Sequence, residues 1–366
     1  MQTRPTILNL AVAALLAVAA PAALAQQEPK AEFGEEIKVS EVLLDVIVTD
    51  KDGTVIVGLQ PEDFVVRENR EPVEVAGVTF YSSSVAKEPV AQIVGEGARV
   101  DPIPEDRYFI LFFDDQRKHQ SDVRVNLIER QLRAGRDAAE WARTSLAPAD
   151  WVSVVGYQRS LRVYTDFTRD PQRISQAISD AATGQEGLGN WPSRQKAEGA
   201  GPSLTDDLPQ GKELVKRTTR IYSALELVAD AAADVVGRKN LVYFGIGFGR
   251  LNTFGQYERD PRYYSGMVRA LNDANVAVYP LDVTPQGVEH SFESALTDLS
   301  EETGGRYFPF FSSFTTPLQE IAAETGGYYL LSYRTERPAD ANGYQKVTVA
   351  TVNPEFRVRA RQGYLY

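Results

Sequence analysis

Residues 108–113 read YFILFF, a continuous apolar run that is followed at once by Asp114 and Asp115. Comparable apolar runs are found at residues 151–158 (WVSVVGYQ), 241–248 (LVYFGIGF) and 276–283 (VAVYPLDV). Short apolar strands that alternate with helix-length segments are typical of a parallel sheet covered by helices on both faces. The sequence therefore predicts an α/β fold with a doubly wound, mostly parallel sheet.

The segments between these runs carry apolar residues at helical spacing. We expect helices at residues 122–146, 171–182, 213–236, 261–274 and 291–303. Pro171 suits the first turn of its helix, and Gly304 suits the end of the last one. Further strands are expected at residues 161–167 and 306–310.

The sequence on either side of this region has β character. Residues 37–84 alternate apolar and polar side chains and predict a small β-rich module, while residues 85–106 carry three prolines and predict a linker. The α/β domain is then expected at 107–327, followed by a C-terminal β-strand extension at 328–366. The sequence leaves open whether that extension lies at the sheet edge or packs with the N-terminal module.

The first 25 residues are typical of a signal peptide. Arg4 precedes the apolar stretch 7–24, and Ala23-Leu24-Ala25 is the small-x-small pattern of a cleavage site. We expect cleavage after Ala25, export to the periplasm or the medium, and no membrane span in the mature chain.

Composition narrows the classes of function. The 366 residues are 43% hydrophobic and 24% charged, which argues against disorder and against a multi-span membrane protein. A net charge of -11 disfavours a nucleic-acid partner. The chain has no cysteine, which excludes disulfides and thiolate chemistry, and its two histidines, His119 and His290, are interpreted as solvated surface residues.

Several segments, taken in their order and spacing, resemble von Willebrand factor type A domains, in particular the exported bacterial VWFA-related proteins of the acidobacterial type. They are VTDKDGTVIVGLQPEDFVVREN, FILFFDD, GRKNLVYFGIGF, LNDANVAVYPLDV, LSEETGGRYF, YYLLSYR and VRARQGYLY. The resemblance implies an adhesion or protein-interaction module, and it implies a metal-ion-dependent adhesion site at the carboxyl ends of the strands.

That site would hold Mg²⁺ through oxygen ligands. By the resemblance, the first aspartate maps to Asp114, and Thr218 or Thr219 takes the threonine position. The two serine positions carry Gln116 and Lys118, and no carboxylate stands in residues 244–248, where the family has a later aspartate. We therefore expect a degenerate site, formed at most by Asp114, Asp115, Gln116, Thr218 and Thr219, and no resident cofactor.

Partner binding is the function that this interpretation favours, through loops 114–121, 184–220 and 245–260. Within these loops Trp191, Arg117 and Lys118 are the candidate contacts for a protein or cell-envelope ligand, because exposed Trp and Arg are frequent binding hot spots. The glycine-rich segment 247–255 matches no phosphate-binding motif and predicts a flexible strand-to-helix turn.

Two alternatives remain open at this level. One is a metal-assisted hydrolase that uses Asp114 and Asp115, which the lack of a usable histidine set disfavours. The other is a structural envelope protein whose β segments mediate assembly.

Overall fold

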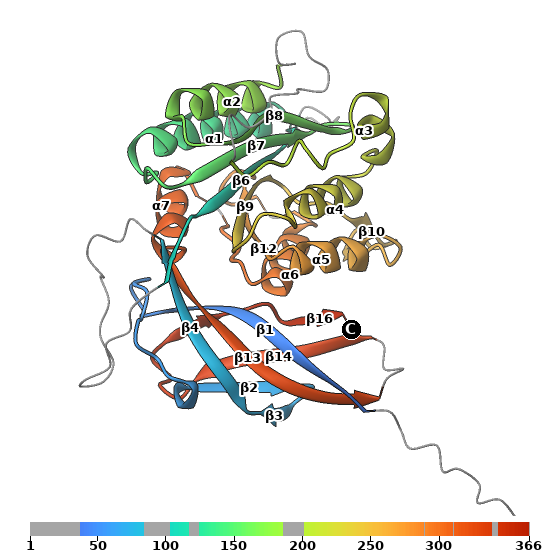
Figure 1. Cartoon of the computed structure of the whole chain (residues 1–366). Helices are drawn as coiled ribbons and strands as arrows, with labels where there is room; N and C mark the ends of the chain where they lie inside the picture. Colours follow the sequence, from blue (N-terminus) through green and yellow to red (C-terminus); the bar gives the residue numbers. More distant parts are fainter. Residues whose placement is uncertain are drawn as a thin grey trace, which may run out of the picture. The chain divides into compact units, whose positions relative to one another are not determined.

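The apolar runs form a five-stranded sheet in the order β12-β9-β6-β7-β8 (Figure 1). The computed structural model describes residues 37–83, 103–116, 124–185, 201–288, 290–309, 311–338 and 343–365. The strands of this sheet are β6 (Tyr108–Asp114), β7 (Trp151–Tyr157), β8 (Leu161–Thr168), β9 (Lys239–Gly245) and β12 (Val276–Asp282). All are parallel except β8, which is antiparallel to β7. The chain starts in the centre at β6, winds outward to β8 and then returns to β9 and β12, so the expected doubly wound α/β fold is confirmed.

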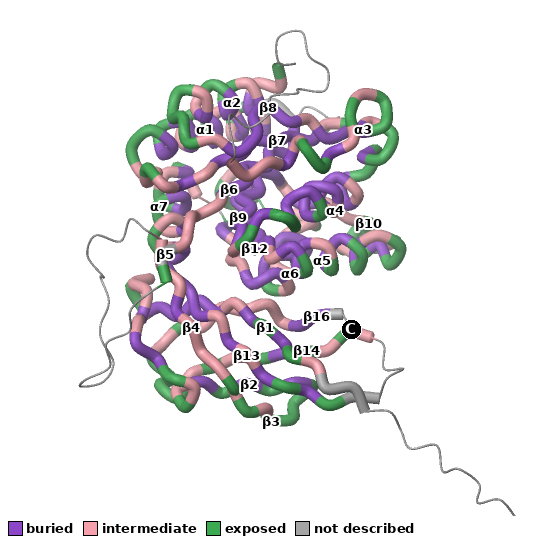
Figure 2. The backbone as a smooth tube through the Cα atoms, viewed as in Figure 1, coloured by how far each residue is buried: buried purple, intermediate pink, exposed green. Residues whose placement is uncertain are grey.

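Helices cover both faces of the sheet. One face packs against α1 (Arg124–Thr144), α2 (Pro171–Thr183) and α7 (Thr315–Glu324). The other packs against α3 (Lys212–Arg217), α4 (Ile221–Ala232), α5 (Tyr264–Asp273) and α6 (Glu293–Thr303). Buried residues therefore follow the sheet strands almost without interruption, as Figure 2 shows.

Two expected elements differ from the observed ones. The single helix predicted at 213–236 is two helices, α3 and α4, because the backbone leaves the helical conformation between them, with ψ of 31° at Thr218 and 145° at Arg220. The strand predicted at 306–310 is reduced to one parallel bridge between Phe308 and Leu281. By contrast, α2 begins at Pro171 as expected, with the Asp170 carboxylate accepting from Gln172 N.

The β-rich flanks share two further sheets. One has the order β15-β1-β13-β4-β5 and the other the order β16-β14-β2-β3. Their strands are β1 (Ile37–Thr49), β2 (Phe64–Glu68), β3 (Glu71–Val73), β4 (Val75–Ser83), β5 (Ile103–Glu105), β13 (Gly327–Pro338), β14 (Tyr344–Thr351), β15 (Arg357–Arg359) and β16 (Gly363–Leu365). A 3-10 turn, Pro61–Asp63, precedes β2.

The question that the sequence left open is answered by this pairing. The long strand β13 lies between β1 and β4 and is antiparallel to both, and β14 pairs with β2. Apolar side chains from both ends of the chain, including Leu44, Phe80 and Tyr329, form one core. The N-terminal and C-terminal β segments thus build a single β sandwich, and residues 103–105 of the expected linker form its edge strand β5.

No helix among the described residues has the length and apolarity that crossing a bilayer requires. The expected signal peptide, residues 1–25, lies outside the described residues.

Candidate functional site

The carboxyl end of β6 brings Asp114 to the point where the chain reverses its winding direction, between β6 and β9. Its carboxylate is fully buried, and Oδ2 accepts a hydrogen bond of 2.8 Å from the hydroxyl of Tyr243 on β9. Tyr243 is itself fully buried, and its burial beside the Asp114 charge raises the pKa of the phenol well above its ordinary value. This tyrosine therefore acts as a fixed hydrogen-bond donor.

Asp115 and Gln116 continue this buried network. The Asp115 amide donates to Tyr157 O, and the Gln116 amide donates to the side chain of Gln131 at 2.7 Å. The Gln116 side chain in turn donates to Asp114 O. These contacts fix the backbone that follows β6.

Thr218 and Thr219 make hydrogen bonds that do not involve Asp114, Asp115 or Gln116. The buried Thr218 hydroxyl accepts from Leu161 N at 3.0 Å and donates to Leu214 O at 2.7 Å. Thr219 is exposed, and its carbonyl accepts from Tyr157 Oη. Both residues therefore tie the start of α4 to β7 and β8.

This arrangement does not fit a divalent cation. Mg²⁺ requires several oxygen ligands in nearly octahedral geometry. Here Tyr243 donates to one oxygen of Asp114, the Thr218 hydroxyl serves backbone groups, and the described residues include no cluster of three or more His, Asp or Glu side chains that could hold a metal. Arg117, Lys118 and Trp191, the other candidates, lie outside the described residues, as does His119.

Divalent ions are accordingly expected to leave the protein's stability unchanged. Its melting temperature should agree within about 1 °C between EDTA and Mg²⁺, Mn²⁺ or Ca²⁺, because an ion that does not bind the folded state cannot stabilise it. Differential scanning calorimetry and isothermal titration measure this. Saturable binding that is lost in Asp114→Asn would contradict the prediction.

A second buried carboxylate at the same edge was missed by the sequence analysis. Asp282 ends β12, and its Oδ2 accepts from His290 Nε2 at 2.7 Å and from the Tyr307 hydroxyl at 2.9 Å. The other ring nitrogen of His290 accepts from Phe292 N, and only 13% of the His290 side chain is exposed. The expectation of a solvated His290 was therefore wrong, because Asp282 holds the ring. The signal was present in VAVYPLDV, where an aspartate follows an apolar strand exactly as Asp114 does.

The Asp282 pair makes stability depend on pH. Burial alone would raise the pKa of Asp282, but hydrogen bonds from His290 and Thr284 outweigh it and hold the pKa below its ordinary value. A lowered carboxyl pKa contributes stability above the unfolded value of about 4, and this stability is lost as pH falls through the folded value.

His290→Phe tests this dependence. The variant should lose about 1 to 2 kcal/mol of unfolding free energy at neutral pH, and the loss should shrink in acid. Urea unfolding from about pH 7 to about pH 3 measures the difference. A loss that stays constant over that range would show that Asp282 is not its source.

A third carboxylate, Asp166 of β8, anchors part of a loop that the sequence analysis singled out. Its Oδ1 accepts from Leu204 N at 2.7 Å, and its Oδ2 accepts from the hydroxyls of Ser203 and Thr205. Leu204 and Leu208 then enter the core beside α4. Within the expected loop 184–220, residues 203–205 are thus anchored by Asp166, whereas residues 186–200 lie outside the described residues.

The segment after β9 is a hairpin rather than the expected flexible turn. Strands β10 (Arg250–Leu251) and β11 (Tyr257–Glu258) pair, and the Asn252 side chain accepts from Phe254 N and Gln256 N. Gly255 takes a positive φ of 74°, which its lack of a Cβ permits. The hairpin places Phe254 in solvent, with 85% of its surface exposed.

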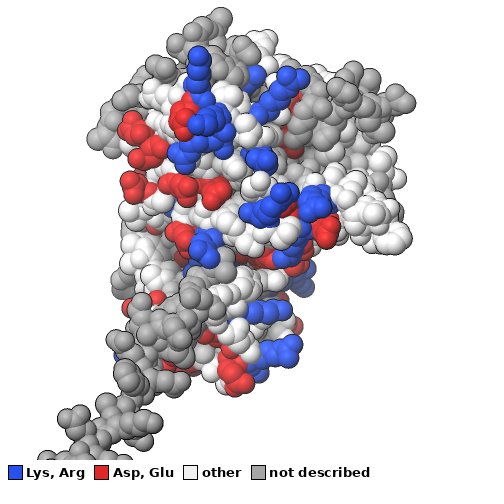
Figure 3. All heavy atoms as spheres, turned by 90° about the vertical axis from the view of Figure 1, so that its right-hand side faces the viewer, with Lys and Arg blue, Asp and Glu red and all other residues white. Residues whose placement is uncertain are grey.

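Charge on the neighbouring surface is mixed. Figure 3 shows basic and acidic side chains interspersed on the face that it presents. Around the hairpin, Arg250, Arg220 and Arg262 are exposed, and the last two lie over the Tyr263 ring at 4.7 and 5.5 Å. The hairpin edge therefore combines an exposed aromatic ring with guanidinium groups.

Comparison with known proteins gives no family assignment. No family model matches the sequence, and no curated protein sequence matches it. Solved structures with partial similarity include proximal thread matrix protein 1 from the mussel byssus, with 13% identity, a TM-score of 0.37, and 60% of this chain and 48% of that chain covered. This chain thus spans about half of the mussel protein's length.

Two bacterial structures are similar in the same limited way. BatB from Bacteroides thetaiotaomicron has 14% identity and a TM-score of 0.38, with 60% of this chain and 97% of that chain covered. The vWF domain of the type V pili tip protein Mfa5 from Porphyromonas gingivalis has 11% identity and a TM-score of 0.25, with 41% and 43% covered. The fold of this protein is therefore assigned from its own strand order. It is a doubly wound α/β sheet joined to a β sandwich.

Proposed function

We propose that this protein is an exported, non-enzymatic interaction module of the von Willebrand factor A type that binds a protein partner at the carboxyl edge of its sheet. The observation that carries the proposal is Phe254, an aromatic side chain held almost fully in solvent at the tip of an ordered hairpin. Exposed aromatic residues beside arginines are the composition of binding hot spots.

The partner's chemistry follows from the hairpin edge. Phe254 and Leu251, which is 48% exposed, offer apolar area, and the exposed Arg250 and Glu258, which lie opposite each other in the hairpin, supply one charge of each sign beside it. The complementary surface is therefore an apolar pocket with a polar rim that carries both signs of charge. In this proposal, cleavage after Ala25 delivers the protein to the periplasm or the medium.

The strand-end carboxylates support a non-enzymatic role. A general base has to reach the proton that it abstracts. Here His290 uses one ring nitrogen on Asp282 and the other on Phe292 N, and Asp114 is fully buried against Tyr243. These groups hold loops in place instead of facing a substrate.

Site-specific photo-cross-linking tests the proposal. A benzoylphenylalanine at position 254 is expected to give discrete adducts with a protein of the native cell envelope or medium. The same probe at Val352, which is 64% exposed in the β sandwich, is the matched control. Adducts at 352 but not at 254, or identical adducts at both, would contradict the assignment of the hairpin edge.

A further inference from the structure

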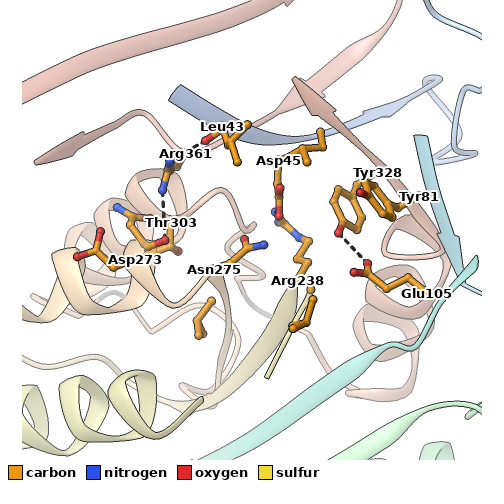
Figure 4. Close-up of a pocket in the computed structure, with 15 residues that line it drawn as sticks. Leu43, Asp45, Tyr81, Glu105, Arg238, Asp273, Asn275, Thr303, Tyr328 and Arg361 are labelled. Carbon is orange, nitrogen blue, oxygen red and sulfur yellow. Dashed lines mark hydrogen bonds and ion pairs between the residues drawn. The ribbon is translucent and has the colours of Figure 1, made fainter. Parts of the chain in front are cut away.

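A cavity of about 460 Å³ lies at the opposite edge of the sheet, at the amino ends of its strands (Figure 4). The β sandwich supplies Asp45, Tyr81 and Tyr328, and the segments that precede β6 and β9 supply Glu105 and Arg238. Ligands of open α/β sheets ordinarily bind at the carboxyl ends of the strands. This cavity is thus separate from the hairpin edge, and it exists only because the sandwich packs there.

Among the described residues, three charged groups in the cavity each have one buried atom without a hydrogen-bond partner, although their other atoms are bonded, as Arg238 is to Gly304 O. Only 9% of the Asp45 side chain and 5% of the Arg238 side chain are exposed. Their nearest atoms, Asp45 Oδ2 and Arg238 Nη1, are 3.9 Å apart, which is too far for a hydrogen bond. Within the described part of the chain, Asp45 Oδ2, Arg238 Nε and Arg361 Nε have no hydrogen-bond partner.

Buried charged atoms without hydrogen-bond partners destabilise the folded protein unless a bound molecule supplies the missing partners. A buried polar atom without a partner has lost its hydrogen bonds to water and gained none in return, and the cost is larger when the group is charged. Figure 4 shows the side chains of Asp45 and Arg238 pointing toward each other, with Arg361 to one side and Tyr328 to the other. The cavity thus contains, among the residues that the structure describes, one hydrogen-bond acceptor without a partner, on Asp45, and two donors without partners, on Arg238 and Arg361.

The remaining walls are rigid. Tyr81 and Tyr328 stack with their ring centroids 5.4 Å apart, and the Tyr328 hydroxyl donates to Glu105 at 2.7 Å. The two terminal nitrogens of Arg361 donate to the carbonyls of Asn272 and Leu43, which fixes its guanidinium group. An aromatic surface therefore stands beside the charged groups.

We propose that this cavity binds a zwitterionic α-amino acid with an aromatic or apolar side chain. The ammonium group donates to Asp45, the carboxylate accepts from Arg238 and Arg361, and the side chain packs on the Tyr81–Tyr328 pair. The cavity volume falls within the range of small-ligand sites, about 300 to 1,000 Å³. Burial disfavours the charged carboxylates of Asp45 and Glu105 and so raises the pKa of each. A bound ammonium group would stabilise the charged form again.

Calorimetric titration of the protein with L-phenylalanine tests this proposal. Two analogues serve as chemical controls: phenethylamine lacks the carboxylate, and phenylpropionate lacks the ammonium group. We expect saturable binding of the amino acid, and binding about tenfold or more weaker for each analogue.

Three variants assign the site. Asp45→Asn keeps the shape and removes the charge, and Tyr81→Leu, in the half-buried member of the tyrosine pair, removes aromatic area without touching a buried charge. Glu41→Gln, exposed on the same strand β1, is the matched control. Both cavity variants should weaken binding by about tenfold or more, and the control should not change it.

Other results overturn the proposal. The first is that L-phenylalanine shows no saturable binding up to about 10 mM. The second is that phenethylamine or phenylpropionate binds as tightly as the amino acid. The third is that a folded Tyr81→Leu variant binds the amino acid as tightly as the unmodified protein. Photo-cross-linking at position 254 is independent of all of these, so the two proposals fail separately.

Discussion

Replacing Asp166 with alanine is expected to lower the free energy of unfolding by about 3 to 5 kcal/mol. The carboxylate accepts from the amides of Phe167 and Leu204, both buried, at 2.8 and 2.7 Å. Alanine leaves these two donors without a partner, and each unsatisfied buried donor costs about 1 to 3 kcal/mol. It also releases residues 201–208, whose Leu204 and Leu208 side chains fill the core.

Urea unfolding measures the stability of Asp166→Ala, and hydrogen exchange measures protection of residues 201–208. The control is Asp166→Asn, which retains acceptor oxygen and should lose less. Equal losses in both variants, or unchanged exchange in 201–208 of the alanine variant, would show that the carboxylate does not anchor this segment.

Arg107→Met is expected to cost a similar amount, about 3 to 5 kcal/mol. The Arg107 guanidinium donates to both oxygens of Asp150, at 2.8 and 2.6 Å, and to Ala322 O. The Asp150 side chain is completely buried, so loss of Arg107 removes two charge-assisted hydrogen bonds from a buried carboxylate and leaves it the backbone amide of Ala147 as a donor. Methionine fills comparable volume, which separates the loss of charge from the loss of packing.

A nearby surface pair is the natural control for that variant. Arg169 contacts Asp106 at 2.6 Å, but both side chains are 39% exposed. Arg169→Met should therefore lose at most about 1 kcal/mol. The midpoint of thermal or urea unfolding ranks the two variants. Similar losses would mean that burial of the Asp150 pair does not set its contribution.

The strands and most helices of the α/β part are predictable because their patterns are local. A run such as YFILFF is buried on both faces wherever it is placed in a parallel sheet, and Pro171 starts a helix through its own ring. The break between α3 and α4 is not local. At this break the Thr218 hydroxyl accepts from Leu161 N on β8, a contact between segments that are far apart in the sequence.

The site was predictable in part. A carboxylate that follows an apolar strand indicates the edge of a sheet, and this placed Asp114 correctly while the same pattern at Asp282 was overlooked. Tyr243 was not predictable as the partner of Asp114, because 129 residues separate the two. His290 lies 8 residues after Asp282, so this partner was within local reach and was overlooked together with Asp282. The cavity beside Asp45 depends on pairing between residues far apart in sequence, so no local pattern indicates it.

The position of β13 between β1 and β4 also sets an order of events as the chain is made. The strands and helices of the α/β part are complete by residue 324, so that part can fold before residues 327–338 are available. The edges of β1 and β4 that face β13 have to wait for residues 327–338, and until then these unpaired edges can capture other chains. Closure of the sandwich is therefore the late step of folding, and a chaperone that shields residues 37–83 would speed the production of native protein.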